Sequence, residues 1–140
     1  MAATLKIKGL DELRKALMDL PLSLSRAAVP IVHGATQATF RDINAAYPTG
    51  GTGNLAQHLQ MELRGSDGVS AGGRVWNTAK HAYIYERGTV KRHWLRGKNT
   101  GASPPHRLFA TIPRAHRLVM EQDLWQLVED AGLTVSSAAV

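Results

Sequence analysis

The sequence predicts an α+β fold, in which long helices pack against a small antiparallel sheet. Two observations predict it. Apolar residues recur at helical spacing in two long segments, one before residue 48 and one after residue 110. Between these segments, Leu59, Met61 and Leu63 alternate with polar residues, the pattern of a strand with one buried face. With 140 residues, 44% of them hydrophobic, the chain has the size of one domain, residues 1–140.

Residues 1–9 are expected to form an N-terminal strand, and residues 10–47 are expected to form two helices separated by Pro21. In the strand, two apolar residues alternate with lysines. The first helix begins at a capping Asp11. One face of this helix carries four leucines at helical spacing: Leu10, Leu13, Leu17 and Leu20.

The second helix is the long central one, expected to begin at Ser23 or Ser25 and to end near Tyr47. Pro30 either kinks this helix or lies in its first turn, because proline lacks an N–H and clashes one turn back. We expect the kink. Mostly small side chains form the contact face, which permits close packing: Ala27, Ala28, Ile31, Ala35, Ala38, Phe40 and Ile43.

Residues 54–88 are expected to form the sheet region, after a glycine-rich loop at 47–53. A turn at 65–68 leads into a second strand, which carries Val69, Val75 and Trp76. The glycines at 72–73 predict a bulge or a break in that strand. Residues 82–85 are expected to be extended again, with Tyr83 and Tyr85 on one face. Packing of both rings in the core is favoured over contact with a neighbouring molecule.

Residues 89–106 form a long basic loop without apolar periodicity, which we expect to be flexible in the free protein. Residues 111–131 are expected to form a C-terminal helix, followed by a frayed tail at 132–140. We expect Trp125 to anchor this helix to the sheet. The helix presents one broad apolar face: Leu118, Leu124, Trp125, Leu127, Val128 and Ala131.

Charge is strongly segregated along the chain, whose formal net charge is +6. Residues 1–86 are nearly balanced, whereas residues 87–117 carry eight basic residues and no acid. Residues 118–140 carry four acids and no base. A positive segment beside a negative one favours complementary contacts between molecules or with polyanions. The basic segment is equally compatible with a solvated surface loop.

No catalytic or metal site is visible in the sequence, so we expect a protein that is not an enzyme and needs no cofactor. There is no cysteine, which excludes disulfides and thiolate chemistry. No stretch is long and apolar enough for a membrane span, and the N-terminus lacks the apolar run of a signal peptide. The glycine-rich loop lacks the ending of a phosphate-binding loop. Six histidines show no metal-ligand spacing: His33, His58, His81, His93, His106 and His116.

Several motifs, in order, resemble the lambdoid-type family of phage neck proteins, known as minor tail components or tail-completion proteins. The family opens with a Gly-Leu-Asp-Glu-Leu helix, matched by residues 9–13. A Pro-x-x-Thr-Gly-Asn-Leu loop follows, matched by Pro48 and residues 52–55 with Gly50 and Gly51 inserted. An Ala-Tyr-x-x-x-Glu-x-Gly-Thr motif is matched at residues 82–89. A proline-bearing passage before the last helix resembles residues 105–115, with altered internal spacing.

The resemblance covers residues 5 to about 130 and implies a structural virion protein of the head–tail junction. It implies a homo-oligomer, expected to be a sixfold ring, which contacts other phage neck and tail proteins, with the DNA in the channel as a further candidate partner. The expected location is the virion, and the host cytoplasm during assembly, with no membrane contact. The motif positions with implied structural roles are Thr52, Gly53, Asn54, Leu55, Tyr83, Glu86, Gly88 and Thr89.

The basic loop is the expected contact for assembly or DNA, through Arg87, Lys91, Arg92, Trp94, Arg96 and Lys98. Glu86 is the nearest acid, and we expect it to pair near Arg87 or with a neighbouring subunit. Gly88 is expected to serve backbone geometry. An alternative function is a small basic nucleic-acid-binding module, although the sequence has no helix-turn-helix, zinc-finger or RNA-binding signature. Nothing in the spacing favours a third class, a small hydrolase or toxin that uses His and Tyr.

Overall fold

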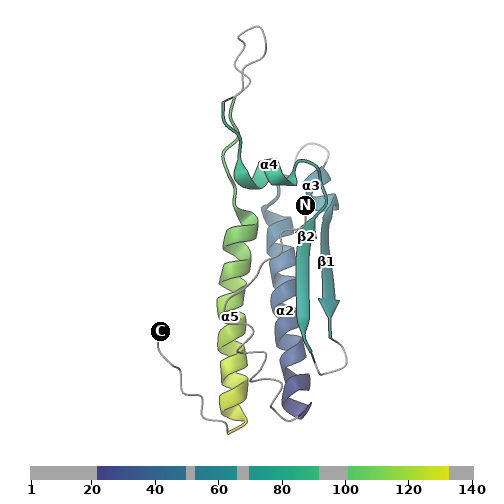
Figure 1. The fold of residues 1–140 in the computed structure, drawn as a ribbon, viewed down its shortest axis with the longest axis vertical. Helices are drawn as coiled ribbons and strands as arrows, with labels where there is room; N and C mark the ends of the chain where they lie inside the picture. Colours follow the sequence, from purple (N-terminus) through teal and green to yellow (C-terminus); the bar gives the residue numbers. More distant parts are fainter. Residues whose placement is uncertain (1–21, 50–52, 66–69, 92–100, 133–140) are drawn as a thin grey trace.

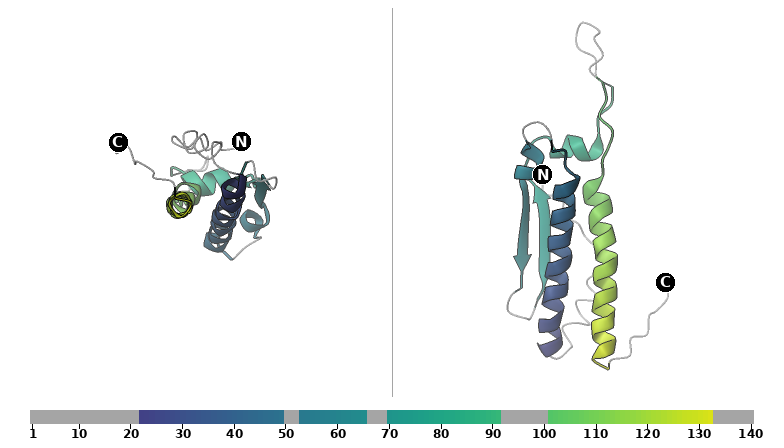
Figure 2. Two further views of the ribbon diagram at one scale, coloured as in Figure 1. Left: turned by 90° about the horizontal axis from the view of Figure 1, so that it is seen from below. Right: turned by 180° about the vertical axis from the view of Figure 1, so that it is seen from behind.

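The fold has three layers: helix α5, helix α2 and a two-stranded hairpin (Figures 1 and 2). The computed structural model describes residues 22–49, 53–65, 70–91 and 101–132. Helix α2 is the middle layer and contacts both α5 and the hairpin. The predicted α+β class is confirmed. The elements are α2 (Leu22–Ala46), α3 (Asn54–Gln57), β1 (Leu59–Arg64), β2 (Gly72–Asn77), α4 (Ala82–Arg87) and α5 (Leu108–Asp130).

Helix α2 follows the prediction closely, with Pro30 inside the helix rather than in its first turn. Its buried residues are Leu24, Ala28, Thr39 and Ile43. Thr39 is polar, but its hydroxyl donates to the carbonyl of Ala35, at 2.8 Å. A polar group satisfied within its own helix is buried at little cost. Small residues therefore let α2 pack on both of its neighbours.

The hairpin pairs β1 with β2 in an unbroken antiparallel register, from Leu59 opposite Asn77 to Arg64 opposite Gly72. The alternating strand at residues 59–63 is thus confirmed, and the predicted bulge or break at Gly72-Gly73 is wrong. Gly73 has a different role. A Cβ there would lie 1.9 Å from Oγ1 of Thr36 on α2, so a glycine is needed for the close approach of β2 to the helix.

The prediction of extended structure for residues 82–85 is also wrong, because they begin helix α4. Alternating aromatic and β-branched residues favour a strand locally, but tertiary packing decides the outcome. In the helix, Ala82 is buried and Tyr85 packs against the core, while Tyr83 points away with 55% of its surface exposed. The two tyrosines therefore do not share a face. Of the predicted sheet region, 54–57 is likewise helical, as α3.

Helix α5 begins three residues before the predicted start, and it packs through a narrower face than predicted. Leu124 and Val128 are buried, but Trp125 is 41% exposed and Leu118 is 57% exposed. The anchoring role predicted for Trp125 is therefore wrong. Among the described helices and strands, α5 makes extensive contact only with α2. Only one narrow stripe of its surface is therefore buried.

The core lies at the end of the body where α3, α4 and the start of α5 meet. Its buried centre is Ile43, Tyr47 and Leu59. Partly buried side chains from α2, α3, β2, α4 and the first half of α5 surround it, including Phe40, Leu55, Val75, Tyr85, Phe109 and Ile112. Within the described residues, no helix is long and apolar enough to cross a membrane. The predicted N-terminal strand, the first helix and almost all of the tail lie outside the described residues.

Candidate functional site

Two chain segments, 88–91 and 101–106, project from the body beyond α4, and we call them the arm (Figure 1). They run side by side and are joined by a pair of hydrogen bonds. The N–H of Thr89 donates to the carbonyl of Ser103 at 2.9 Å, and the N–H of Ser103 donates to Oγ1 of Thr89 at 3.0 Å. The two segments therefore leave the body as one clasped unit.

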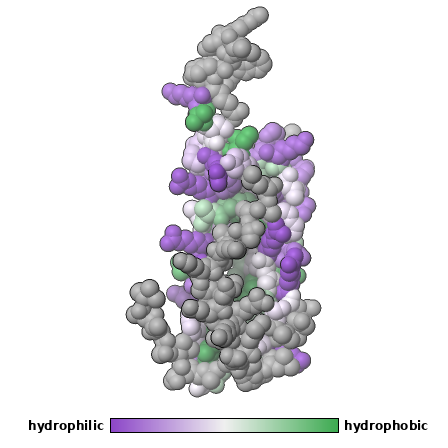
Figure 3. Space-filling model, viewed as in Figure 1, coloured by the Kyte–Doolittle hydropathy of each residue, from purple (hydrophilic) through white to green (hydrophobic). Residues whose placement is uncertain are grey.

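Of the predicted contact residues, Arg87 and Lys91 are described, and both are exposed. Arg87 lies at the end of α4, where its guanidinium is 4.9 Å from the centre of the Tyr83 ring and donates to the Tyr83 hydroxyl at 3.0 Å. Val90 is 84% exposed. Figure 3 shows hydrophobic and hydrophilic surface next to each other on the described part of the arm. Outside the described residues lie Arg92, Trp94, Arg96 and Lys98.

Gly88 lies at the base of the arm and has the backbone role that was predicted for it. Its φ of 73° and ψ of −177° lie in a region that is almost exclusive to glycine. A Cβ at this position would lie 2.5 Å from the carbonyl oxygen of Ser103 and 2.8 Å from the nitrogen of Pro105. The absent side chain thus lets the outgoing segment cross the returning one at close range.

Glu86, which lies on α4, caps the first turn of α5. Helix α5 begins after Arg107, whose side chain makes no capping hydrogen bond. Instead, Oε2 of Glu86 accepts from the N–H of Phe109 at 3.1 Å. A carboxylate at a helix N-terminus satisfies an open N–H and complements the helix dipole. Among the described contacts, the Glu86 carboxylate thus pairs with a backbone N–H of α5 rather than with the Arg87 side chain, and pairing with a neighbouring subunit stays a prediction.

The second oxygen of this carboxylate, Oε1, is buried and has no hydrogen-bond partner among the described residues. Burial raises the pKa of Glu86 above its ordinary value of 4.5. The N–H groups of Phe109 and Leu108 and the nearby His106 act in the opposite direction. Glu86 therefore stabilises the start of α5, while the burial of its carboxylate costs free energy.

An aromatic column joins the base of the arm to the core. His106 stacks on Tyr85, with ring centroids 4.0 Å apart, and Tyr85 meets Tyr47 edge-on at 5.6 Å. The Tyr47 hydroxyl accepts from Nδ2 of Asn77 at 3.0 Å, so the column ends on the hairpin. Burial raises the pKa of Tyr47 to about 12, which keeps its hydroxyl neutral. No local sequence signal indicated this column.

The motif at residues 52–55 is also structural. Gly53 has a positive φ of 61°, a conformation that glycine adopts without the steric cost of a side chain. Asn54 begins α3, and its carbonyl accepts from Nδ1 of His58 at 2.9 Å. The side chain of Leu55 packs on the core, and its carbonyl accepts from Asn77 at 2.7 Å. Thr52 lies outside the described residues.

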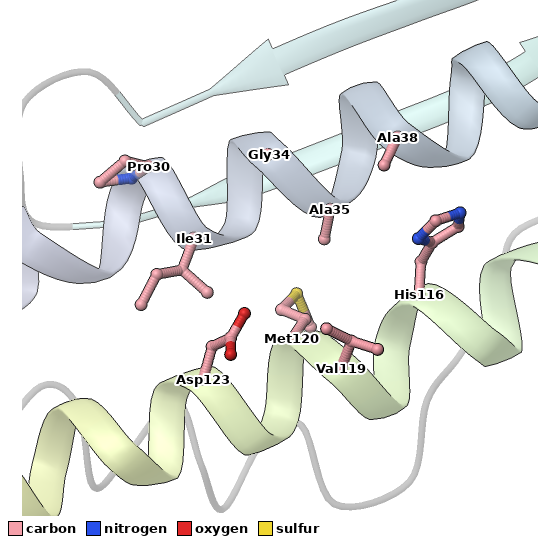
Figure 4. A pocket seen from close by; sticks show the side chains of 9 residues that line it. All are labelled: Pro30, Ile31, Gly34, Ala35, Ala38, His116, Val119, Met120 and Asp123. Atoms are coloured by element: carbon pink, nitrogen blue, oxygen red, sulfur yellow. The ribbon is translucent and has the colours of Figure 1, made fainter.

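A groove of about 290 Å³ lies between α2 and α5, and sequence analysis did not predict it (Figure 4). Ile31 and Ala35 of α2 face Met120 of α5 across it. At one end, Nε2 of His116 lies 2.7 Å from Oδ2 of Asp42, which ties the two helices together. The hydrogen bond with His116 lowers the pKa of Asp42. The groove is lined mainly by small apolar residues and holds no arrangement of a nucleophile and a base.

Among the described residues, no group of three or more His, Cys, Asp or Glu side chains comes together in a way that could hold a metal ion. Comparisons of the chain with protein families, with curated proteins and with solved structures gave no match. The arm and its base therefore remain the most distinctive feature of the described structure.

Proposed function

We propose that this chain is a structural protein of a phage head–tail junction, a neck or tail-completion subunit that acts by oligomeric assembly. One observation carries the proposal. The motif that resembles the neck family, residues 82–89, forms the whole base of the arm through the capping carboxylate of Glu86, the crossing at Gly88 and the clasp at Thr89. These residues thus share one task, to hold the base of the arm, which leads into the basic loop of the sequence.

Two further features support an assembly role. The arm contributes exposed rather than core side chains at its described positions 90 and 91. A segment that folds without contributing to the core is suited to reach a neighbouring molecule. The basic charge of residues 87–117 adds long-range attraction toward an acidic partner. We therefore assign the arm the role of the docking element, in a homo-oligomeric ring that joins other neck and tail proteins.

The test replaces the basic residues of the loop by Glu in one variant, at Lys91, Arg92, Arg96 and Lys98. We expect this variant to fold, because charge changes outside the core alter stability little. In a phage that lacks the wild-type gene, it should leave filled heads and tails that fail to join. The matched control makes the same change in charge on the body, at Arg26, Arg41, Arg74 and Lys80, and should support plaques.

Normal plaque yield from the loop variant would refute the docking role, and loss of folding would show that the segment is structural. The alternative function, a nucleic-acid-binding module, gives a different result. The purified chain would then remain monomeric and bind duplex DNA with a steep loss of affinity as salt rises. Arg87 and Lys91 are exposed, as residues that contact DNA must be, so DNA binding should be measured alongside the assembly assay.

A further inference from the structure

The outer face of α5 carries large apolar side chains that stay partly exposed. Leu118 and Trp125 are 57% and 41% exposed. They are seven residues apart and therefore lie on the same side of the helix. Gln122 and Glu129 continue this stripe and are also exposed. We call these four residues the outer stripe. Exposed aromatic and aliphatic side chains of this kind are typical of contact surfaces.

The charge of the outer stripe is complementary to that of the arm. The distal half of α5 lies in the segment that carries acids and no base, and Glu129 is its acid on the stripe. The arm is the opposite, because Lys91 and the nearby Arg87 and Arg107 are exposed and residues 87–117 contain no acid. Val90 adds an exposed apolar side chain beside Lys91. Each surface thus combines an apolar contact with one sign of charge.

Within one molecule the outer stripe runs away from the arm, from the middle of α5 to its last turn. The arm joins the body just before the first residue of α5, and α5 extends for 23 residues, about 35 Å. Figure 1 shows the described part of the arm directed away from the body, while α5 runs down the other side of its base. Glu129 lies in the last turn of the helix. An arm therefore meets this stripe only on another copy.

We propose that the outer stripe of α5 is the docking surface for the arm of a second copy of this chain. The contact is heterologous, because the arm of one copy meets a different surface on the next, and repetition gives a ring when the rotation closes. This inference rests on the proposed assembly function and names the partner surface. Apolar contact of Val90 with Leu118 and Trp125 supplies burial, and Lys91 opposite Glu129 supplies charge pairing and orientation.

Two single charge reversals test the contact, Lys91→Glu and Glu129→Lys. Self-association is measured by sedimentation velocity across protein concentration and salt. Wild type should associate, and each variant alone should associate about tenfold more weakly, because like charges then face each other. Mixing the two variants should restore association, since each arm then finds an opposite charge on the other variant. Carrying both changes in one chain should restore it as well.

Asp123→Lys is the matched control for Glu129→Lys. It makes the same change in net charge on the same helix, but Asp123 lines the groove on the α2 side. It should leave self-association within about threefold of wild type and should not rescue Lys91→Glu. Trp125→Ser should weaken association without altering the circular dichroism spectrum, which separates loss of the contact from loss of the fold.

The inference is overturned if the chain stays monomeric up to its solubility limit, or if mixing the two reversals restores nothing. It is also overturned if Asp123→Lys acts like Glu129→Lys, because the effect would then be one of net charge alone. Failure of this contact can be distinguished from failure of the proposed function. A monomeric chain whose loop variant still blocks the joining of heads and tails would place the arm on a different neck protein.

Discussion

Glu86 shows how one residue can stabilise a fold and oppose it at the same time. Its carboxylate accepts from the N–H of Phe109, which the N-terminal turn of α5 leaves open. Yet Oε1 is buried with no partner in the described structure, and burial raises the pKa of the group. Substitution by Ala removes the helix contact, and we expect a cost of about 1 kcal/mol in the free energy of unfolding.

The effect of Glu86 on stability should depend on pH with an unusual sign for a carboxylate. Its pKa in the folded protein lies above the ordinary 4.5, so the folded state binds the proton more tightly than the unfolded state. Its contribution to stability is therefore largest below that value and declines as pH rises through the folded pKa. Glu86→Gln keeps an acceptor and has no charge to lose. Its melting temperature relative to wild type should rise between about pH 4 and about pH 8.

Asp42→Asn is the control, with the opposite sign. The hydrogen bond with His116 lowers the pKa of Asp42, so its contribution is present above the ordinary 3.8 and is lost as pH falls through the folded value. The Asn variant should therefore fall behind wild type as pH rises toward 3.8, and the difference should stay nearly constant above that value. A constant difference between Glu86→Gln and wild type across the range would contradict the burial of a charge at position 86.

Gly88 offers a second residue-level prediction, with a close control in Gly101. Both have a positive φ, of 73° and 84°. A Cβ at Gly88 would collide with Ser103 and Pro105, whereas one at Gly101 would meet nothing within 4 Å. We expect Gly101→Ala to cost about 1 kcal/mol, from backbone strain alone. Gly88→Ala should cost about 3 kcal/mol, because overpacking is added to strain. Urea unfolding measures both, and equal costs would mean that the crossing is not tight.

At the level of elements, α5 has one face that is buried and stabilises the fold and another that is exposed. Leu124 is only 2% exposed, while its neighbour Trp125 is 41% exposed. Leu124→Ala should therefore cost about 2–5 kcal/mol, from lost burial and a cavity. Trp125→Ala should cost about 1 kcal/mol or less when measured on the monomer at low protein concentration. The reverse order in a urea titration would show that the tryptophan, and not the leucine, anchors the helix.

An element was predicted correctly where the pattern of neighbouring residues alone determines it, and missed where packing against distant residues decides. The boundaries of α2 were predicted because its apolar stripe repeats over many turns, and β1 because Leu59, Met61 and Leu63 alternate. Helix α4 was missed because six residues carry too few turns to show a helical period, and its tyrosines favour a strand. On α5, the spacing of Leu118 and Trp125 fits a helix face, but it does not say which face the rest of the fold covers.

For the whole molecule, the relations that build the candidate site join residues far apart in the chain. Glu86 and Phe109 are 23 positions apart, and Asp42 and His116 are 74 apart. No local pattern encodes such pairs, so the sequence predicted the backbone role of Gly88 but not the capping by Glu86. The segregation of charge was visible in the sequence. That Leu118 and Trp125 are exposed on the helix that carries these charges became visible only in the fold.

The clasp between Thr89 and Ser103 makes the arm an exchangeable part. These residues are 14 positions apart, and their hydrogen bonds close the chain at the base of the arm. The entropy of closing a loop grows only with the logarithm of its length, so doubling the enclosed segment costs about 0.6 kcal/mol. Insertions and new sequences beyond the clasp therefore leave α4, α5 and the core almost unaffected. Binding preference can change there over evolution, or by design, while the folded body stays the same.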